Sequence, residues 1–226
     1  MSKQEAVQAK AYLIRGGRPL SGEVTVSGAK NAATKQLVAA LLTNEPVILH
    51  NVPDIGDVSA TIDMLVSLGV KIERKGDTCI VNAGSLCTSE VASALSRKNR
   101  IPILLMGPLL HRFGEARIPA LGGCKIGARP VDIHLAGLEK MGAEIVNEDG
   151  YYVARAKKLK ATMIELPFPS VGATENLMFA AVKAQGTTTI ANAAIEPEIM
   201  DTARLLQSMG AIINLDANRT WVIEGV

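Results

Sequence analysis

One pattern of apolar and polar positions occurs three times along the 226-residue chain. Its copies read LVSLGVKIERKGDTCIV, LEKMGAEIVNEDGYYVA and LQSMGAIINLDANRTWVIEG. Each copy contains the last turn of an amphipathic helix, a glycine, and two alternating segments separated by a polar turn. Glycine commonly follows a helix, and alternation with a period of two is typical of strands. Each copy therefore predicts a helix followed by a β-hairpin, with Gly69, Gly142 and Gly210 in equivalent positions about 70 residues apart.

The segments upstream of these copies also align. PVILHNVPDIGD, ARIPALGGCKIGARPVD and TTTIANAAIEPEIMD each read as a strand, a loop and a helix start, and an apolar helix precedes each of them. The chain is therefore predicted to have an α/β (α+β) fold of three β-α-β-α-β-β repeats, at about 29–84, 98–158 and 162–226, within one domain over 29–226. Pseudo-threefold symmetry, with helices inside and sheets outside, closes them into an inside-out barrel.

The N-terminal part of the chain does not belong to these repeats. Residues 1–10 are predicted to be a flexible polar tail. The stretch AYLIRGGRPLSGEVTVSG, over 11–28, has two alternating runs around a Gly-Gly-Arg-Pro turn, which predicts a hairpin.

Composition and charge exclude several classes of protein. Hydrophobic residues make up 48% but aromatic residues only 3%, which predicts an aliphatic core. The 24 basic and 22 acidic residues are mixed, which argues against a nucleic-acid surface or a membrane anchor. No apolar run suits a membrane span, and the first residues do not resemble a signal peptide. Three cysteines without CxxC spacing favour free thiols in the cytoplasm, and the three scattered histidines favour structural roles over metal ligation.

The stretch LGGCKIGARPVD, over 121–132, has the residue types of a reactive loop. Cys124 lies between glycines, with Lys125 and Arg129 close by, and Pro130 begins an amphipathic run. A helix N-terminus beside cations favours anions and lowers the pKa of a thiol. The alternative is a small buried cysteine in a turn beside two solvated cations.

Each repeat brings polar residues to a corresponding loop. Lys30 and Asn31 lie at a helix start without acidic residues, where Lys30 is either phosphate-facing or solvated. Arg100 precedes an apolar run and either caps a helix, the favoured reading, or reaches a ligand. The segment Ser170–Gly172 opens a helix, and either binds a diphosphate or caps the helix through Ser170. Asp132 most simply stabilises a helix N-terminus.

Four segments resemble one family closely. SGAKNAA, GPLLHRFGEARIPALGGCKIGARPVDIHLAGLEKMGA, SVGATE and AAIEPEIMDTA are similar to motifs of the UDP-N-acetylglucosamine enolpyruvyl transferases of peptidoglycan synthesis, and the likeness runs from about residue 12 to the last. The resemblance implies transfer of the enolpyruvyl group of phosphoenolpyruvate to the 3′-hydroxyl of UDP-N-acetylglucosamine, without metal or organic cofactor. The related shikimate-pathway transferases fit the cysteine loop less well.

The resemblance also implies roles for individual residues. Cys124 would protonate phosphoenolpyruvate and form an adduct with it, Lys30 and Asn31 would contact phosphoenolpyruvate and the sugar, and Arg100 and Arg129 would neutralise phosphates. Lys30 and Arg129 join Cys124 as the catalytic candidates. The remaining substrate-binding candidates fall into a uridine pocket and a diphosphate loop: Arg129, Pro130, Val131, Asp132 and Ile133 for the first, and Ser170, Val171 and Gly172 for the second.

The sequence departs from the family in two respects. Phe168 stands where some members have a lysine, which weakens the diphosphate assignment. The chain also ends where a second domain of similar size would begin, and that domain supplies the aspartate base and the carboxylate-binding arginine. The hairpin over 11–28 would belong to that second domain. Two hypotheses follow. The chain is one half of the transferase, inactive alone, either as a fragment or as one part of a split protein with a separate second-half domain. Alternatively, it is a lone UDP-sugar-binding module.

Overall fold

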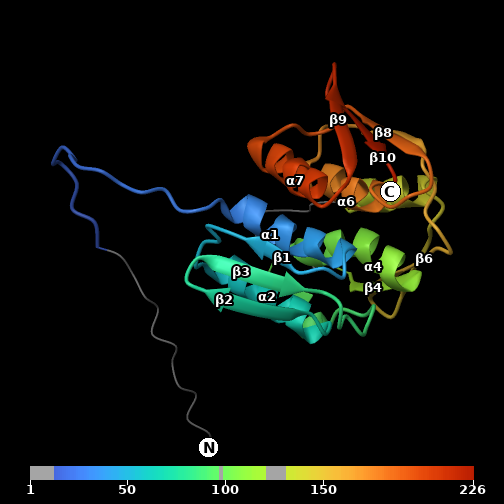
Figure 1. Ribbon diagram of the computed structural model, residues 1–226, viewed down its shortest axis with the longest axis horizontal. Helices are drawn as coiled ribbons and strands as arrows, with labels where there is room; N and C mark the ends of the chain where they lie inside the picture. Colours follow the sequence, from blue (N-terminus) through green and yellow to red (C-terminus); the bar gives the residue numbers. More distant parts are fainter. Residues whose placement is uncertain (1–12, 97–98, 121–130) are drawn as a thin grey trace, which may run out of the picture.

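The computed structural model describes residues 13–96, 99–120 and 131–226. Figure 1 shows three β-sheets arranged around a group of helices. No helix in these ranges is long and apolar enough to cross a membrane.

The first repeat begins with a helix and ends with a hairpin. Its elements are α1 (Lys30–Ala39) with the 3-10 turn η1 (Ala40–Leu42), β1 (Val47–Leu49), α2 (Gly56–Ser67), β2 (Lys71–Lys75) and β3 (Thr78–Asn82). The strands form a sheet of order β1-β3-β2, in which β3 is antiparallel to both neighbours. Val47 and Leu49 face the core and Ile48 faces outward, as the alternation predicts.

The second repeat has the same strand–helix–hairpin order after its main helix. Its elements are a short helix α3 (Ser93–Ser96), the 3-10 turn η2 (Ile101–Leu105), α4 (Met106–Phe113), β4 (Glu115–Pro119), α5 (Asp132–Lys140), β5 (Glu144–Glu148) and β6 (Tyr151–Arg155). The strand order is β4-β6-β5. The apolar run NRIPILLMGPLLHRF, over 99–113, is the helix predicted to precede β4, and it is divided into η2 and α4, with Pro102 near the start of η2.

The third repeat carries an additional strand. It consists of β7 (Met163–Glu165), α6 (Val171–Ala181), β8 (Thr187–Ala191), α7 (Pro197–Ser208), β9 (Ile212–Asp216) and β10 (Thr220–Glu224). The sheet order is β7-β8-β10-β9, with β7 parallel to β8 and the other pairs antiparallel.

The three glycines predicted to be equivalent occupy the same position. Gly69, Gly142 and Gly210 each stand one residue after the C-cap of α2, α5 and α7, with φ angles of 96°, 95° and 103°. Glycine adopts this left-handed backbone at the least cost. Together with the repeated strand order, these positions confirm the predicted α/β architecture.

The core is built around the first helix of each repeat. Residues 173–181 of α6 are buried throughout, and α6 contacts α4, α5, α7 and η2, while α1 contacts α2, α7 and η2. Small and aliphatic side chains dominate this interior, in keeping with the low aromatic content. Trp221 is an exception, because its buried indole N–H donates to the carbonyl oxygen of Ala194 at 3.0 Å.

The predicted N-terminal hairpin is not formed. Within 11–28, the described residues 13–28 contain no strand and lead away from the body of the molecule (Figure 1). The apolar positions of its alternating runs are exposed, with Leu20 at 99% and Val24 at 89%. An isolated two-stranded hairpin is marginally stable in water, and among the described residues no sheet lies against this one. The tail predicted for 1–10 lies outside the described residues.

Candidate functional site

The N-terminus of α1 presents two of the predicted site residues to solvent. Lys30 and Asn31 occupy its first two positions, and both are exposed. The helix has no acidic residue in its first turn and no side-chain cap at Ala29. Its unpaired N–H groups and the Lys30 ammonium therefore concentrate positive potential at one point.

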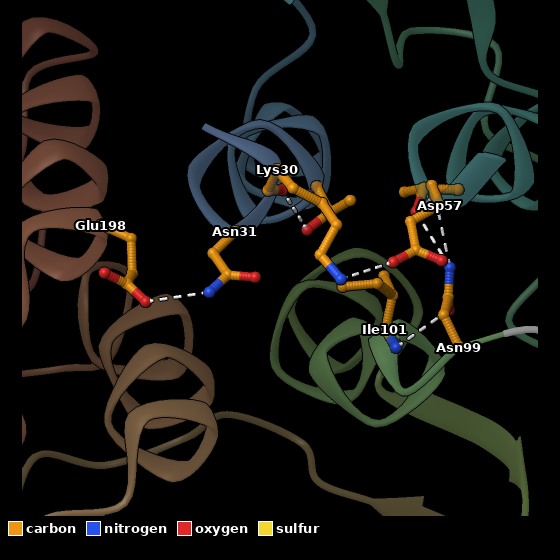
Figure 2. Close-up of polar contacts among 8 residues, drawn as sticks. Lys30, Asn31, Asp57, Asn99, Ile101 and Glu198 are labelled. Atoms are coloured by element: carbon orange, nitrogen blue, oxygen red, sulfur yellow. Dashed lines mark hydrogen bonds and ion pairs between the residues drawn. The ribbon is translucent and has the colours of Figure 1, made fainter. Parts of the chain in front are cut away.

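Carboxylates from the first turns of two neighbouring helices flank this point. Lys30 Nζ forms an ion pair with Asp57 Oδ2 of α2 at 2.8 Å, and Asn31 Nδ2 donates to Glu198 Oε1 of α7 at 3.2 Å. Figure 2 shows Lys30 and Asn31 reaching in opposite directions to these partners. Among the described residues no donor bonds to Asn31 Oδ1, so this carbonyl oxygen can act as an acceptor. Three helix N-termini, those of α1, α2 and α7, thus meet at one place.

The segment before η2 joins this group through Asn99. Its Nδ2 donates to Thr61 Oγ1 at 3.3 Å and to the Asp57 carbonyl oxygen at 3.4 Å, and its Oδ1 accepts from the Ile101 N–H at 3.1 Å (Figure 2). Asn99 therefore ties the start of η2 to α2. Arg100, the next residue, is the N-cap residue of η2, and η2 packs against α1.

The starts of α5 and α6 lie against each other through a buried histidine. Asn176 Nδ2 donates to His134 Nδ1 at 3.3 Å, and the His134 ring packs against Gly172, where a Cβ would lie 3.2 Å from Cε1. Burial and, to a smaller extent, the positive charge of Arg100 lower the pKa of His134 to about 4, although Asp132 opposes the shift. The imidazole is therefore neutral at physiological pH, with Nδ1 as acceptor. Its structural role agrees with the sequence prediction.

Ser170 caps α6, one of the two roles predicted for it. Its hydroxyl accepts from the Ala173 N–H at 3.3 Å, and its carbonyl oxygen accepts from the Thr174 hydroxyl at 2.8 Å. Val171 and Gly172 form the first turn of the helix. Phe168, two residues earlier, is half exposed. Contact of this segment with a diphosphate stays a prediction.

A pocket of about 220 Å³ adjoins the start of α5. It is lined by α5 and by the end of β7, including Asp132, Ile133, Lys140 and Pro167. Asp132 lies in the first turn of α5, where its charge favours the helix dipole, and Val131 and Ile133 are buried. A larger open hollow of about 880 Å³, beside β4 and β6, includes none of the predicted site residues.

Three predicted site residues, Cys124, Arg129 and Pro130, lie outside the described residues. The predicted site residues that the structure does describe form two groups. Lys30, Asn31 and Arg100 gather at the starts of α1 and η2, and Asp132, Ile133 and the segment 170–172 gather at the starts of α5 and α6. The positive charge of Arg100, in the first group, is one of the causes that lower the pKa of His134, which lies beside the second group.

The sequence analysis missed the residues that hold these groups in place. Asp57, Asn99 and Glu198 were not singled out. Asp57, in PDIGD, and Glu198, in EPE, each follow a strand and a loop at the start of a helix. An acidic residue at this position was the sequence signal that could have identified them. Nothing in the sequence marked Asn99, because its partners lie about 40 residues away.

Comparison with known proteins defines the class. A family model for EPSP synthase (3-phosphoshikimate 1-carboxyvinyltransferase) matches residues 14–226. The enolpyruvyl transferase NikO from Streptomyces tendae is 25% identical and has a TM-score of 0.82, covering 93% of this chain and 50% of that one. EPSP synthase from Acinetobacter baumannii, 22% identical with a TM-score of 0.72, shares the fold over 90% of this chain and 47% of its own. The chain therefore belongs to the EPSP synthase family of enolpyruvyl transferases.

Curated relatives narrow this assignment. The UDP-N-acetylglucosamine 1-carboxyvinyltransferase of Gluconobacter oxydans is 49% identical over 216 residues, which are 95% of this chain and 52% of the relative. The enzyme of the same name, numbered 1, from Symbiobacterium thermophilum is 51% identical over 224 residues, with 95% and 50% covered. The chain spans about half the length of the curated relatives it matches.

Proposed function

We propose that this chain is the cysteine-bearing half of an enzyme that transfers the enolpyruvyl group of phosphoenolpyruvate to the 3′-hydroxyl of UDP-N-acetylglucosamine. The observation that carries the proposal is the N-terminus of α1. There Lys30 and Asn31 face solvent between Asp57 and Glu198, in a chain about 49% identical to transferases of that name. The proposed site extends along the starts of α5 and α6.

The Lys30 ion pair suits the binding of a phosphate. The side chains of Lys30 and Asp57 are 55% and 40% exposed, and such solvated pairs contribute only about 0–1 kcal/mol. Lys30 can therefore exchange Asp57 for a phosphate oxygen at little cost, while Asp57 keeps the free ammonium oriented. Helix N–H groups and Arg100 add to the attraction for an anion.

The reaction assigns a step to each half. Cys124 would donate a proton to C3 of phosphoenolpyruvate, the 3′-oxygen would bond to C2, and loss of a C3 proton and of phosphate would then complete the transfer. Lys30, Arg100 and Arg129 would stabilise the phosphate charge. The base that takes the hydroxyl proton and the arginine that holds the carboxylate would come from a second half. If no second half exists, a UDP-sugar-binding module without catalysis is the alternative.

Replacement of Lys30 tests the site directly. Lys30→Ala is expected to weaken UDP-N-acetylglucosamine binding in the presence of phosphoenolpyruvate by roughly 10- to 100-fold, because charge-assisted hydrogen bonds contribute about 1.5–3 kcal/mol. Isothermal titration measures this change. Lys71→Ala, which removes an exposed lysine from β2, is the matched control. Equal affinities of the Lys30→Ala variant and the unmodified chain would contradict the proposed site.

Cys124 is expected to react with the epoxide fosfomycin faster than the other two cysteines. Lys125 and Arg129 are its near neighbours in sequence, and cations favour the reactive thiolate. Cys79, in contrast, is buried in β3, and burial raises the pKa of its thiol. Mass-spectrometric peptide mapping after short exposure, with Cys124→Ser as control, measures the rates. Preferential labelling of Cys79 or of the exposed Cys87 would refute the assignment.

A further inference from the structure

The first sheet lacks the parallel neighbour that the corresponding edge has in the other two repeats. In the third repeat β7 pairs in parallel with β8, and in the second a parallel bridge joins Glu90 to Arg117 of β4. The corresponding edge of the first sheet is β1, and among the described residues no strand pairs with it there. An open edge exposes a row of unpaired N–H and C=O groups.

The backbone bonds at this edge are the same in both complete repeats. The Thr189 N–H of β8 donates to the Thr162 carbonyl at 3.1 Å, and the Arg117 N–H of β4 donates to the Ser89 carbonyl at 2.9 Å. A bond in the reverse direction, from the Val91 N–H to the Arg117 carbonyl at 3.0 Å, completes the second pair. The residue of β1 that corresponds to Thr189 and Arg117 is Ile48.

Each of these parallel neighbours also buries an apolar side chain. Ile164 beside β8 is 2% exposed, and Val91 beside β4 is 0% exposed. In the first repeat the segment before α1 reads GEVTVSG, with Val24 and Val26 at alternating positions. Both valines are exposed, Val26 at 83%. The first repeat therefore has an unpaired strand edge at β1. It also has, just before α1, an alternating segment whose valine side chains are exposed.

Two asparagines set the register. Asn51 follows β1 and Asn192 follows β8, both with positive φ, of 56° and 51°. Asn192 Nδ2 donates to the carbonyl of Leu166, directly after β7, at 2.9 Å, and the Gly28 N–H donates to Asn51 Oδ1 at 3.1 Å. Gly28 and Asn51 therefore occupy the positions in the first repeat that Leu166 and Asn192 occupy in the third. A Cβ at residue 28 would overlap the Asn51 carbonyl oxygen, so only glycine fits this contact.

Extending this register backwards gives a consistent pairing. With residue 28 beside 51, Val26 lies beside Leu49 and Val24 beside Val47, and both partners face the core. A pairing register shifted by one residue would place the two valines on the outer face of the sheet, beside the exposed Ile48. The register taken from the asparagines is therefore also the one in which the two valines are buried.

We infer that residues 23–27 add to β1 as a fourth, parallel strand in this chain. The Ile48 N–H then donates to the Val24 carbonyl, and the Val26 N–H donates to the Ile48 carbonyl. The occupant is the chain's own segment, because Gly28 already holds it at the end of β1. The strand closes the open edge whether or not the chain takes part in enolpyruvyl transfer.

Amide hydrogen exchange of the full chain, followed by NMR at two protein concentrations, tests the strand. The amides of Val26 and Ile48 are expected to exchange at least about tenfold more slowly than in an unstructured chain. Val26→Asp should abolish this protection, because it places a charge against Leu49. Thr25→Asp, which alters the outward face, should preserve it.

Two outcomes would overturn the inference. The first is exchange of the Val26 amide at the unstructured rate at both concentrations. The second is protection that appears only at the higher concentration, which would assign the edge to a second copy of the chain. Since Val24 and Val26 are exposed in the present structure, neither aspartate variant endangers the fold.

Discussion

Phosphate release by the purified 226-residue chain, supplied with phosphoenolpyruvate and UDP-N-acetylglucosamine, is expected to stay near background. The chain would supply the proton donor Cys124 and the phosphate-binding Lys30 and Arg100, but the proposed base lies in a second half. Loss of a general base costs about 10²–10⁴-fold in rate, and loss of half the surface that positions the substrates costs more. A phosphate-release assay measures this activity. UDP-N-acetylglucosamine binding should remain detectable by titration.

Adding a separate second half to the chain provides a second test of this prediction. The second half of the Gluconobacter oxydans relative, added as a separate protein, should raise phosphate release if the two halves dock. Cys124→Ala is the control, because this variant should bind the second half but not restore turnover. Turnover by the unassisted chain comparable to that of a full-length relative would contradict the two-half proposal.

The stability of the chain is expected to fall as the pH rises from about 5 to about 8, because of Glu175. This side chain in α6 is fully buried, and neither of its oxygens has a hydrogen-bond partner among the described residues. Burial raises the pKa of Glu175 to about 8, although Lys35, with Nζ 3.8 Å away, opposes the shift. The two charges are too far apart for a hydrogen bond, so the ammonium compensates only part of the desolvation.

The sign of this effect follows from proton binding. Between pH 4.5 and 8 the unfolded chain has released the Glu175 proton, whereas the folded chain retains it, so rising pH favours unfolding. Well above pH 8 the loss corresponds to about 5 kcal/mol, a large part of the stability of a domain.

Glu175→Gln should therefore raise the free energy of unfolding at pH 8.5 by about 3 to 5 kcal/mol and flatten its pH dependence. Urea denaturation at pH 5, 7 and 8.5 measures both quantities. Glu165→Gln, on the exposed face of β7, is the matched control and should change neither. A Glu175→Gln variant as pH-dependent as the unmodified chain would show that Glu175 is ionised in the folded state.

Much of the fold could be predicted from the sequence because the signals are local. The glycines Gly69, Gly142 and Gly210 and the alternating segments after them mark three equivalent hairpins, and the structure contains all three. The N-terminal hairpin predicted for 11–28 is not present in the described residues 13–28. Its alternation is real, but alternation does not identify the strand with which a segment pairs.

The candidate site was less predictable because its contacts are distant in sequence. Lys30 and Asn31 were identified at a helix start, but their partners Asp57 and Glu198 are 27 and 167 residues away. Helix propensity explains an acidic residue at each of those positions equally well without any partner. Only the packing of α1 against α2 and α7 brings these side chains together.

The position of α6 has a consequence for cooperativity. This helix of the third repeat contacts α4 and η2 of the second, and it is buried on every side over 173–181. In a solenoid each repeat touches only its neighbours along the chain, so stability accumulates repeat by repeat. Here the innermost helices share a single apolar cluster, and removal of one repeat would expose the inner faces of the other two. The three repeats should therefore fold and unfold as one unit.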